Sequence, residues 1–427
     1  MLHSMVKYIL LAGFFLFFPL VIIYMCSKWS VFKKAGCIVL AYGFGLFLGT
    51  SGILPKGSEA YKIALEGRHF IPESEMQVLI SEGKVHEGDS DANQVAAIQD
   101  MIPSVMVPLA FPLLLFSLNI KRWLRFARKG FISVLLALIA GLTMVTAGFF
   151  IFRNLIPDAW KLAGMFVGIY TGGTPNFVAL SMALDVDANL FILTSTYDMI
   201  VGAFLVLFFV TLAPRIFRFI LPPFEASANT FVSETYTTAG EDLENYEGML
   251  RKDRILPLLG AFGLSVLIFL AAFGLSLILP NIPQMVVVIL TITTLGILAS
   301  LIKQLNNIEK TFQLGMYLIM VFSLTVASMA DLKTMFDINV LSLILFITWV
   351  YFGSLAMHLV LAKIFRIDSD NFLITATAFI FSPPFVPLVA SALKNKDVIV
   401  TGITGGIIGY ILGNYFGVAL AYFLKGF

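Results

Sequence analysis

The stretch TGGTPNF, at residues 171–177, interrupts an apolar segment, residues 160–184, that would otherwise form one continuous membrane helix. Inside a helix each glycine costs about 1 kcal/mol and proline about 3 kcal/mol relative to alanine. The same residues suit a helix that stops and restarts, because Gly172 and Gly173 can end one half-helix, Thr174 can cap the next, and Pro175 fits its first turn. The stretch therefore predicts a broken helix.

A second interruption, FSPPF at residues 381–385, lies at the corresponding place in the second half of the chain. Backbone that is broken at membrane depth persists only where protein buries it or where it lines a water-filled cavity. Two broken apolar segments in corresponding halves are the best sequence indication of a transporter's binding site. We therefore expect the two interruptions to form the functional site.

The composition identifies the broad class of the protein. Of the 427 residues, 59% are hydrophobic and 13% are charged, and the mean hydropathy is +0.93. These values predict a polytopic protein of the cell (plasma or inner) membrane, with the lipid bilayer as its partner. The net charge of +2 comes without a basic patch, so no nucleic acid is expected. Cys26 and Cys37 are expected to be free structural thiols.

Twelve hydrophobic segments are expected, and most are long enough to cross the hydrocarbon core as helices. They lie near residues 6–26, 35–54, 101–119, 131–153, 160–184, 188–213, 254–279, 284–303, 307–330, 338–363, 370–393 and 398–424. The fold expected is therefore an all-α polytopic membrane protein.

The chain divides into two membrane repeats joined by a linker. Residues 1–213 form the first repeat, 214–253 a cytoplasmic linker with basic edges, and 254–427 the second repeat. The first repeat contains a polar insertion, residues 55–100, with nine acidic residues against four Lys and Arg. Neither the insertion nor the linker is expected to have a core of its own, so each is interpreted as a small cap or a linker.

The charges of the loops predict the orientation. The turn at residues 119–130 holds five Lys and Arg and no acid, so it should be cytoplasmic, which places the insertion outside. The linker is then cytoplasmic only if segment 160–184 enters and leaves the membrane on the same side. Treating segment 370–393 in the same way gives two inverted repeats, each with about five crossings plus one broken or re-entrant segment. Crossing broken helices remain the alternative.

An internal repeat supports this arrangement. Residues 176–184 align with residues 385–393 at a shift of 209 residues. Residues 116–121 also resemble residues 322–324 followed by 331–333. The match is weak, but it agrees with the positions of the two breaks.

Three motifs carry a resemblance to a known family. GGTPN at 172–176, TSTYD at 194–198 and SPP at 382–384 resemble the YjcL-like membrane proteins (domain of unknown function 819), over nearly the whole chain. More distantly, the first motif resembles bile acid:sodium symporters, and the paired re-entrant segments resemble 2-hydroxycarboxylate and glutamate:sodium symporters. The resemblance implies an inverted-repeat, elevator-type secondary transporter that binds substrate at the broken segments. The second motif differs in having no glycine pair.

The first break can recognise an anion without any basic residue. A half-helix that starts at Thr174 directs unpaired N–H groups and a partial positive charge toward the membrane midplane. Carbonyl groups that end the preceding half-helix would suit Na⁺. A packing kink between helices is the alternative interpretation. The expected substrate-binding residues are Thr171, Gly172, Gly173, Thr174, Pro175, Asn176, Ser382, Pro383 and Pro384.

Asp198 is the only acidic residue deep in segment 188–213. An ionised carboxylate at this depth costs about 2.5–3.5 kcal/mol, so it should face a cavity or a partner. It could bind Na⁺ with nearby hydroxyls or carry a proton, and a neutral structural Asp is the alternative. The expected ion-coupling residues are Asp198, Thr194, Thr196 and Asn414; interfacial caps are expected at Asn119 and Asp331, and a structural histidine at His358.

We therefore expect a secondary active transporter, coupled to Na⁺ or H⁺, that moves a small organic anion by elevator-type alternating access. No enzyme activity is expected, because the four histidines and two cysteines lack metal spacing and no base accompanies Ser382. No cofactor is expected beyond a Na⁺ at Asp198. The alternatives are a monovalent cation/proton antiporter, or a membrane scaffold or receptor that transports nothing. A homodimer is compatible with the sequence.

Overall fold

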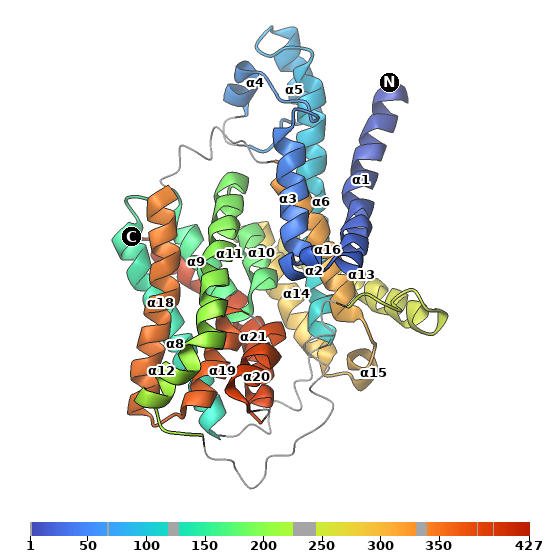
Figure 1. Ribbon diagram of the computed structural model, residues 1–427. Coiled ribbons are helices and arrows are strands. Elements are labelled where there is room, and N and C mark those ends of the chain that lie inside the picture. Colours follow the sequence, from blue (N-terminus) through green and yellow to red (C-terminus); the bar gives the residue numbers. More distant parts are fainter. Residues whose placement is uncertain are drawn as a thin grey trace. The chain divides into compact units, whose positions relative to one another are not determined.

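The computed structural model describes residues 2–65, 68–117, 128–224, 245–329, 340–381, 383–395 and 397–427. These residues form helices, turns and bends, and none of them belongs to a β-strand. Figure 1 shows the helices in chain order by colour. The all-α fold predicted from the sequence is confirmed.

Among the described residues, seven helices are long and apolar enough to cross a membrane. They are α1 (Leu2–Lys28), α6 (Asp89–Phe116), α8 (Arg128–Phe152), α11 (Ala188–Thr211), α13 (Lys252–Ile278), α18 (Val340–Ile364) and α21 (Ile399–Leu424). Three shorter apolar helices are α3 (Cys37–Thr50), α14 (Gln284–Ser300) and α16 (Thr311–Ala327). The two remaining apolar segments are broken, into α9 (Ala159–Gly172) and α10 (Thr174–Ala183), and into α19 (Ser369–Ile380), η3 (Pro383–Phe385) and α20 (Val386–Leu393). Each of the twelve expected segments thus corresponds to a helix or a broken helix.

The remaining helices are short. They are α2 (Ser30–Ala35), α4 (Glu59–Ala64), α5 (Glu73–Ser81), α12 (Ala213–Ile220) and α15 (Lys303–Asn306). The chain forms two compact units: unit 1 contains Met1–Ala110, Asp187–Ile192 and Met316–Asp337, and unit 2 contains Phe111–Val186, Leu193–Gly315 and Ile338–Phe427. Asn119 and Asp331, expected as caps, lie outside the described residues.

The polar insertion, which belongs to unit 1, has a small core of its own, contrary to the sequence prediction. Tyr61, Ile71, Met76 and Val85 are all buried and pack together. Asn93, near the start of α6, accepts hydrogen bonds from the Tyr61 hydroxyl at 3.0 Å and from the Ile71 amide at 2.7 Å. Sequence reasoning missed this core because its apolar residues are dispersed among many charged ones.

The two ends of the insertion are also joined by hydrogen bonds. The Asp89 carboxylate accepts hydrogen bonds from the Ser58 amide at 2.7 Å and from the Ser58 hydroxyl at 2.8 Å.

Burial is the main cause that raises the pKa of Tyr61 to about 12, and the charge of the nearby Asp89 carboxylate is the smaller cause. The Tyr61 hydroxyl therefore stays protonated and continues to donate its hydrogen bond at ordinary pH.

In unit 2 the first arms of the two broken segments, α9 and α19, are buried and pack against other helices. Every residue of α9 from 162 to 172 is buried, and so is every residue of α19. Helix α9 packs against α21, α8 and α19, while α8 also packs against α18 (Figure 1). A helix that is apolar all round belongs in a protein interior. The break at Gly173, which is itself buried, therefore lies where a backbone break is tolerated.

Other helices of unit 2 have apolar faces that no described residue covers. On α13, the exposed fractions of Leu256, Leu267 and Ile278 are 74%, 64% and 73%. Side chains of this kind contact lipid in a membrane protein. Together with the seven candidate spans, they place the chain in the membrane as a multi-pass protein.

Candidate functional site

The first break is centred on Gly173, between α9 and α10. Its backbone lies at φ 66° and ψ −155°, a conformation that is essentially restricted to glycine. The Gly173 amide still donates to the Ile169 carbonyl at 2.8 Å, and the Gly173 carbonyl accepts from the Phe177 amide at 3.1 Å. The prediction of a helix that stops and restarts is thus correct, with Pro175 in the first turn of α10. The N-cap is Gly173, however, and Thr174 is already helical.

Helices α9 and α10 fold back on each other as a hairpin, which we call the first hairpin (residues 159–186). A side chain added at Gly164 of α9 would meet Leu184, and one added at Gly168 would meet Leu180. The residue numbers therefore increase along one arm in the direction in which they decrease along the other. At the base, Lys161 Nζ donates to the carbonyl of Asp185 at 2.6 Å. The arms are therefore antiparallel, which is the geometry of a re-entrant segment.

Glycines of α21 allow that helix to pack closely against the first hairpin. A Cβ at Gly409 would overlap the carbonyl of Thr171, and a Cβ at Gly413 would overlap the side chains of Thr171 and Asn176. Gly417 lies one further turn along α21, against Leu180. Small residues at four-residue spacing permit such close approach between membrane helices. This contact fixes the tip of the first hairpin against α21.

Two of the expected substrate-binding side chains are used by this packing. Thr171 is 1% exposed, and its hydroxyl donates to the Val167 carbonyl of its own helix at 2.7 Å. Asn176 is fully buried and donates from Nδ2 to the Gly409 carbonyl at 3.1 Å. The Asn176 Oδ1 atom has no hydrogen-bond partner among the described residues. Thr171 and Asn176 are thus brought together, but as supports of the break.

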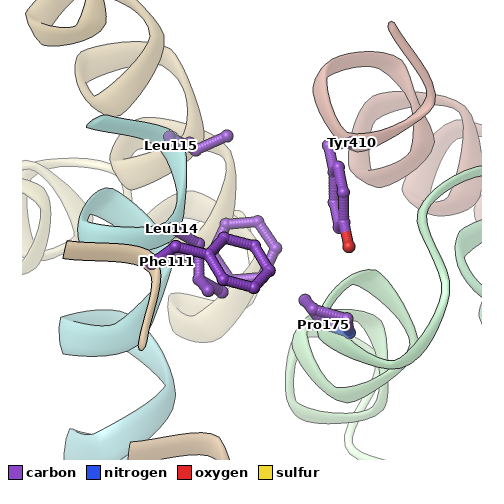
Figure 2. A pocket seen from close by; sticks show the side chains of 6 residues that line it. Phe111, Leu114, Leu115, Pro175 and Tyr410 are labelled. Carbon is purple, nitrogen blue, oxygen red and sulfur yellow. The ribbon is translucent and has the colours of Figure 1, made fainter. Parts of the chain in front are cut away.

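A small hollow of about 10 Å³ lies beside the first turn of α10, and its walls are almost entirely apolar. Its lining residues are Phe111, Leu114 and Leu115 of α6, Pro175 of α10, Phe312 of α16 and Tyr410 of α21. Figure 2 shows the ring of Tyr410 with its oxygen turned toward Pro175, and Phe111 and Leu114 on the opposite side. The positive end of α10 therefore lies next to apolar surface.

The second break has a different apex. Here α19 ends at Ile380, and the prolines at 383 and 384 form the short 3₁₀ turn η3 before α20 begins. The Pro383 ring packs against Gly406 of α21. Ser382, another expected binding residue, lies outside the described residues. No described residue of this apex has a positive φ, which agrees with its lack of a glycine pair.

The bases of the two broken segments nevertheless resemble each other. We call residues 369–395 the second hairpin, because Asn395 Nδ2 donates to Asp370 Oδ2 at 2.9 Å and so joins its two ends. In both hairpins the second arm ends at a left-handed residue, Asp185 with φ 52° and Lys394 with φ 56°. The next amide then bonds back five residues, from Val186 to Ser181 at 3.0 Å and from Asn395 to Ala390 at 3.1 Å. These positions differ by the 209 residues of the sequence repeat.

Asp198 has a partner that the sequence did not reveal. The half-buried carboxylate of Asp198, on α11, accepts a hydrogen bond from the hydroxyl of Tyr351 on α18. Tyr351 is 2% exposed, and its ring lies 6.1 Å from that of Phe166 in α9. The pair is therefore adjacent to the middle of the first hairpin. A tyrosine within an apolar segment was the available signal, but it could not be matched to Asp198 without the fold.

Of the other expected ion-coupling residues, Thr194 and Thr196 lie on α11 with Asp198, whereas Asn414 lies on α21. Asn414 is fully buried and donates to the Thr293 hydroxyl of α14 at 3.1 Å. Thr194 is fully buried, and its hydroxyl has no hydrogen-bond partner among the described residues. Thr196 is half-buried. Tyr351 is thus the described hydrogen-bond partner of Asp198, and Thr293 of α14 is that of Asn414.

His358 behaves as a structural histidine. It is fully buried on α18, its Nε2 lies 3.3 Å from the Ser133 hydroxyl, and its ring lies 4.6 Å from that of Phe372. Cys26 and Cys37 are both buried, and neither forms a disulfide with a described residue. Among the described residues, no three His, Cys, Asp or Glu side chains come together as a metal site.

The fold and the buried breaks define a multi-pass α-helical membrane protein with two helical hairpins in its interior. The model of the family described as "Protein of unknown function (DUF819)" matches residues 88–427, and the chain belongs to this family. The chain is also similar to the "Uncharacterized membrane protein YjcL" of Bacillus subtilis (strain 168). The two are 24% identical over 343 residues, which cover 77% of this chain and 84% of the relative.

The close packing of α21 on the first hairpin leads to a test of stability. Gly409→Ala places a methyl group against the Thr171 carbonyl, where overpacking costs about 1–3 kcal/mol. We expect the apparent Tm of the purified protein to fall by several degrees. Gly202→Ala, on α11 with open space around its Cβ position, is the matched control and should not lower the Tm. Equal melting of the two variants would contradict the close contact.

Proposed function

We propose that this protein is a secondary active transporter for a small organic anion that carries an apolar group. The observation that carries the proposal is the buried break at Gly173, beside the hollow at Pro175. The amides at the start of α10 have no acceptors within the helix, and the helix dipole adds partial positive charge there. An anionic group can bind these amides, and its apolar part then contacts the residues that line the hollow.

The coupling ion in this proposal acts at Asp198, and both Na⁺ and H⁺ fit the group present. A carboxylate within a membrane helix marks an ion or proton pathway when it has no cationic partner. The partner that the structure gives Asp198 is the neutral hydroxyl of Tyr351. Tyr351 contacts the ring of Phe166 in the first hairpin, so the charge of Asp198 and the position of that hairpin can influence each other.

Movement of the hairpins relative to other parts of the protein would give alternating access of the elevator type. Support comes from two hairpins with similar bases and from the 209-residue repeat that relates them. The inverted orientation of the two halves, the cytoplasmic linker 214–253 and the external insertion 55–100 are part of the same proposal. Recognition by dipoles and hydroxyls, rather than bond-making, is the chemistry proposed for the site.

A monovalent cation/proton antiporter is the second candidate, because the Asp198–Tyr351 pair could operate without an organic ligand. A scaffold or receptor is the third. A flux assay, electrogenic or fluorescent, distinguishes the three candidates when proteoliposomes are exposed to a panel of carboxylates. The transporter gives a flux that requires a carboxylate, the antiporter gives a cation flux without one, and the scaffold gives neither.

Replacement of Gly173 tests the anion site. In Gly173→Ala the new methyl group is strained at φ 66° and ψ −155°, at a cost on the order of 1–3 kcal/mol. We expect carboxylate-dependent flux to be lost because the amides at the start of α10 shift, while the protein remains inserted and monodisperse. The control is Gly274→Ala on α13, where the Cβ position is open. Flux at the native rate in Gly173→Ala would show that the break is only structural.

Replacement of Asp198 tests the coupling ion. Asp198→Asn keeps the side-chain volume and can still accept the Tyr351 hydrogen bond, but it removes the charge. We expect carboxylate accumulation no longer to respond to an imposed Na⁺ or pH gradient. The control, Asp397→Asn, changes an acid in the turn before α21 and should leave coupling intact. Gradient-driven accumulation by Asp198→Asn would exclude Asp198 as the coupling residue.

A further inference from the structure

Helix α12, which follows α11 at the start of the linker, packs against the second hairpin. Ala213, Pro214 and Phe217 form its buried face. The ring of Phe217 lies 4.9 Å from that of Phe372 in α19, with the two planes at 75°. Edge-to-face rings at this distance are a favourable contact. The linker is therefore attached to the first arm of the second hairpin by apolar packing.

Arg218 of α12 reaches both arms of the second hairpin. One nitrogen of its guanidinium donates to the Leu393 carbonyl at the end of α20, at 3.0 Å, and lies 3.6 Å from Asp370 Oδ1 at the start of α19. The Asp370 side chain is only 5% exposed. It also accepts hydrogen bonds from Ser369 Oγ at 3.0 Å and from Asn395 Nδ2 at 2.9 Å. A buried carboxylate needs such donors, so Arg218 belongs to the closure of the hairpin base.

A backbone hydrogen bond ties the linker to the same place. The amide of Ser369, the first residue of α19, donates to the carbonyl of Pro222 at 3.0 Å. The first N–H groups of a helix lack partners within the helix. The linker therefore supplies an acceptor that the hairpin itself does not provide.

The described contacts at the base of the first hairpin come from a lysine of its own segment. At its base, Lys161 Nζ contacts the Asp185 carbonyl at 2.6 Å and the Asp158 carboxylate at 3.2 Å. All three residues belong to the same continuous segment. The two hairpins thus have similar backbones at their bases but different ties. The first is held by its own lysine, and the second by its own Asn395 together with an arginine of the linker.

We propose that the linker is a clamp on the second hairpin. Arg218 bridges the two arms at the base, in addition to the Asn395–Asp370 hydrogen bond, and the Pro222 carbonyl binds the start of α19. The arms then separate more readily when α12 moves away from α19. A ligand or modification that displaces residues 213–224 would then free the second hairpin and leave the first unchanged. This inference goes beyond the proposed transport function and does not require it.

Hydrogen–deuterium exchange of the full-length protein in lipid nanodiscs tests the clamp. In Arg218→Gln, we expect exchange in peptides covering residues 369–372 and 393–395 to be about 3- to 10-fold faster, as suits the loss of one charged hydrogen-bond donor. Arg215→Gln is the matched control, because Arg215 is an exposed arginine of the same helix. Lys161→Gln should speed exchange only at the base of the first hairpin.

Equal exchange in Arg218→Gln and Arg215→Gln would overturn the proposal. Faster exchange throughout α8, α18 and α21 in Arg218→Gln would also overturn it, because Arg218 would then support the whole unit. Asp370→Asn serves where Arg218→Gln does not fold. Asp370→Asn keeps the Arg218–Leu393 contact, so a smaller increase in the exchange rate of the same peptides supports the clamp. An unchanged exchange rate would contradict the role of the Arg218–Asp370 contact.

Discussion

The backbone break at Gly173 is the constraint on which the rest of the candidate site depends. A helix interrupted inside a membrane protein exposes amide and carbonyl groups that lipid cannot satisfy. Here the interruption is limited to one glycine, both of whose backbone groups still form hydrogen bonds. Restricting the interruption to one residue requires backbone angles φ and ψ that are essentially unavailable to residues other than glycine. The glycines of α21 are needed in turn, because they let that helix cover the break closely.

The two hairpins show how one architecture accommodates two different sequences. Both have a second arm that ends at a left-handed residue with the same five-residue hydrogen bond, 209 residues apart. Their apices differ, since the first turns at a glycine and the second at two prolines in a 3₁₀ turn. Unequal apices favour unequal roles. The first apex leaves helix amides beside a hollow, whereas the second is packed by Pro383 against Gly406.

Much of this fold follows from the sequence, because long apolar segments and glycine–proline interruptions are local signals. The twelve segments, both breaks and the matched 209-residue shift were predictable in this way. The partners of buried polar groups were not. Nothing local to Asp198 indicates Tyr351, which is 153 residues away. In the same way, nothing local to Asn414 indicates its hydrogen bond to Thr293 of α14, which is 121 residues away. The small core of the insertion was missed because its charged surface dominates its composition.

A density map of the protein with a transported carboxylate bound is the most direct test of the account. We expect the carboxylate within hydrogen-bond distance of the backbone amides at Thr174 and Asn176, with its apolar part against Pro175 and Tyr410. Such a position would join the dipole of α10 and the hollow in a single binding site. Ligand density elsewhere, with the amides at the start of α10 covered by protein, would contradict the central claim.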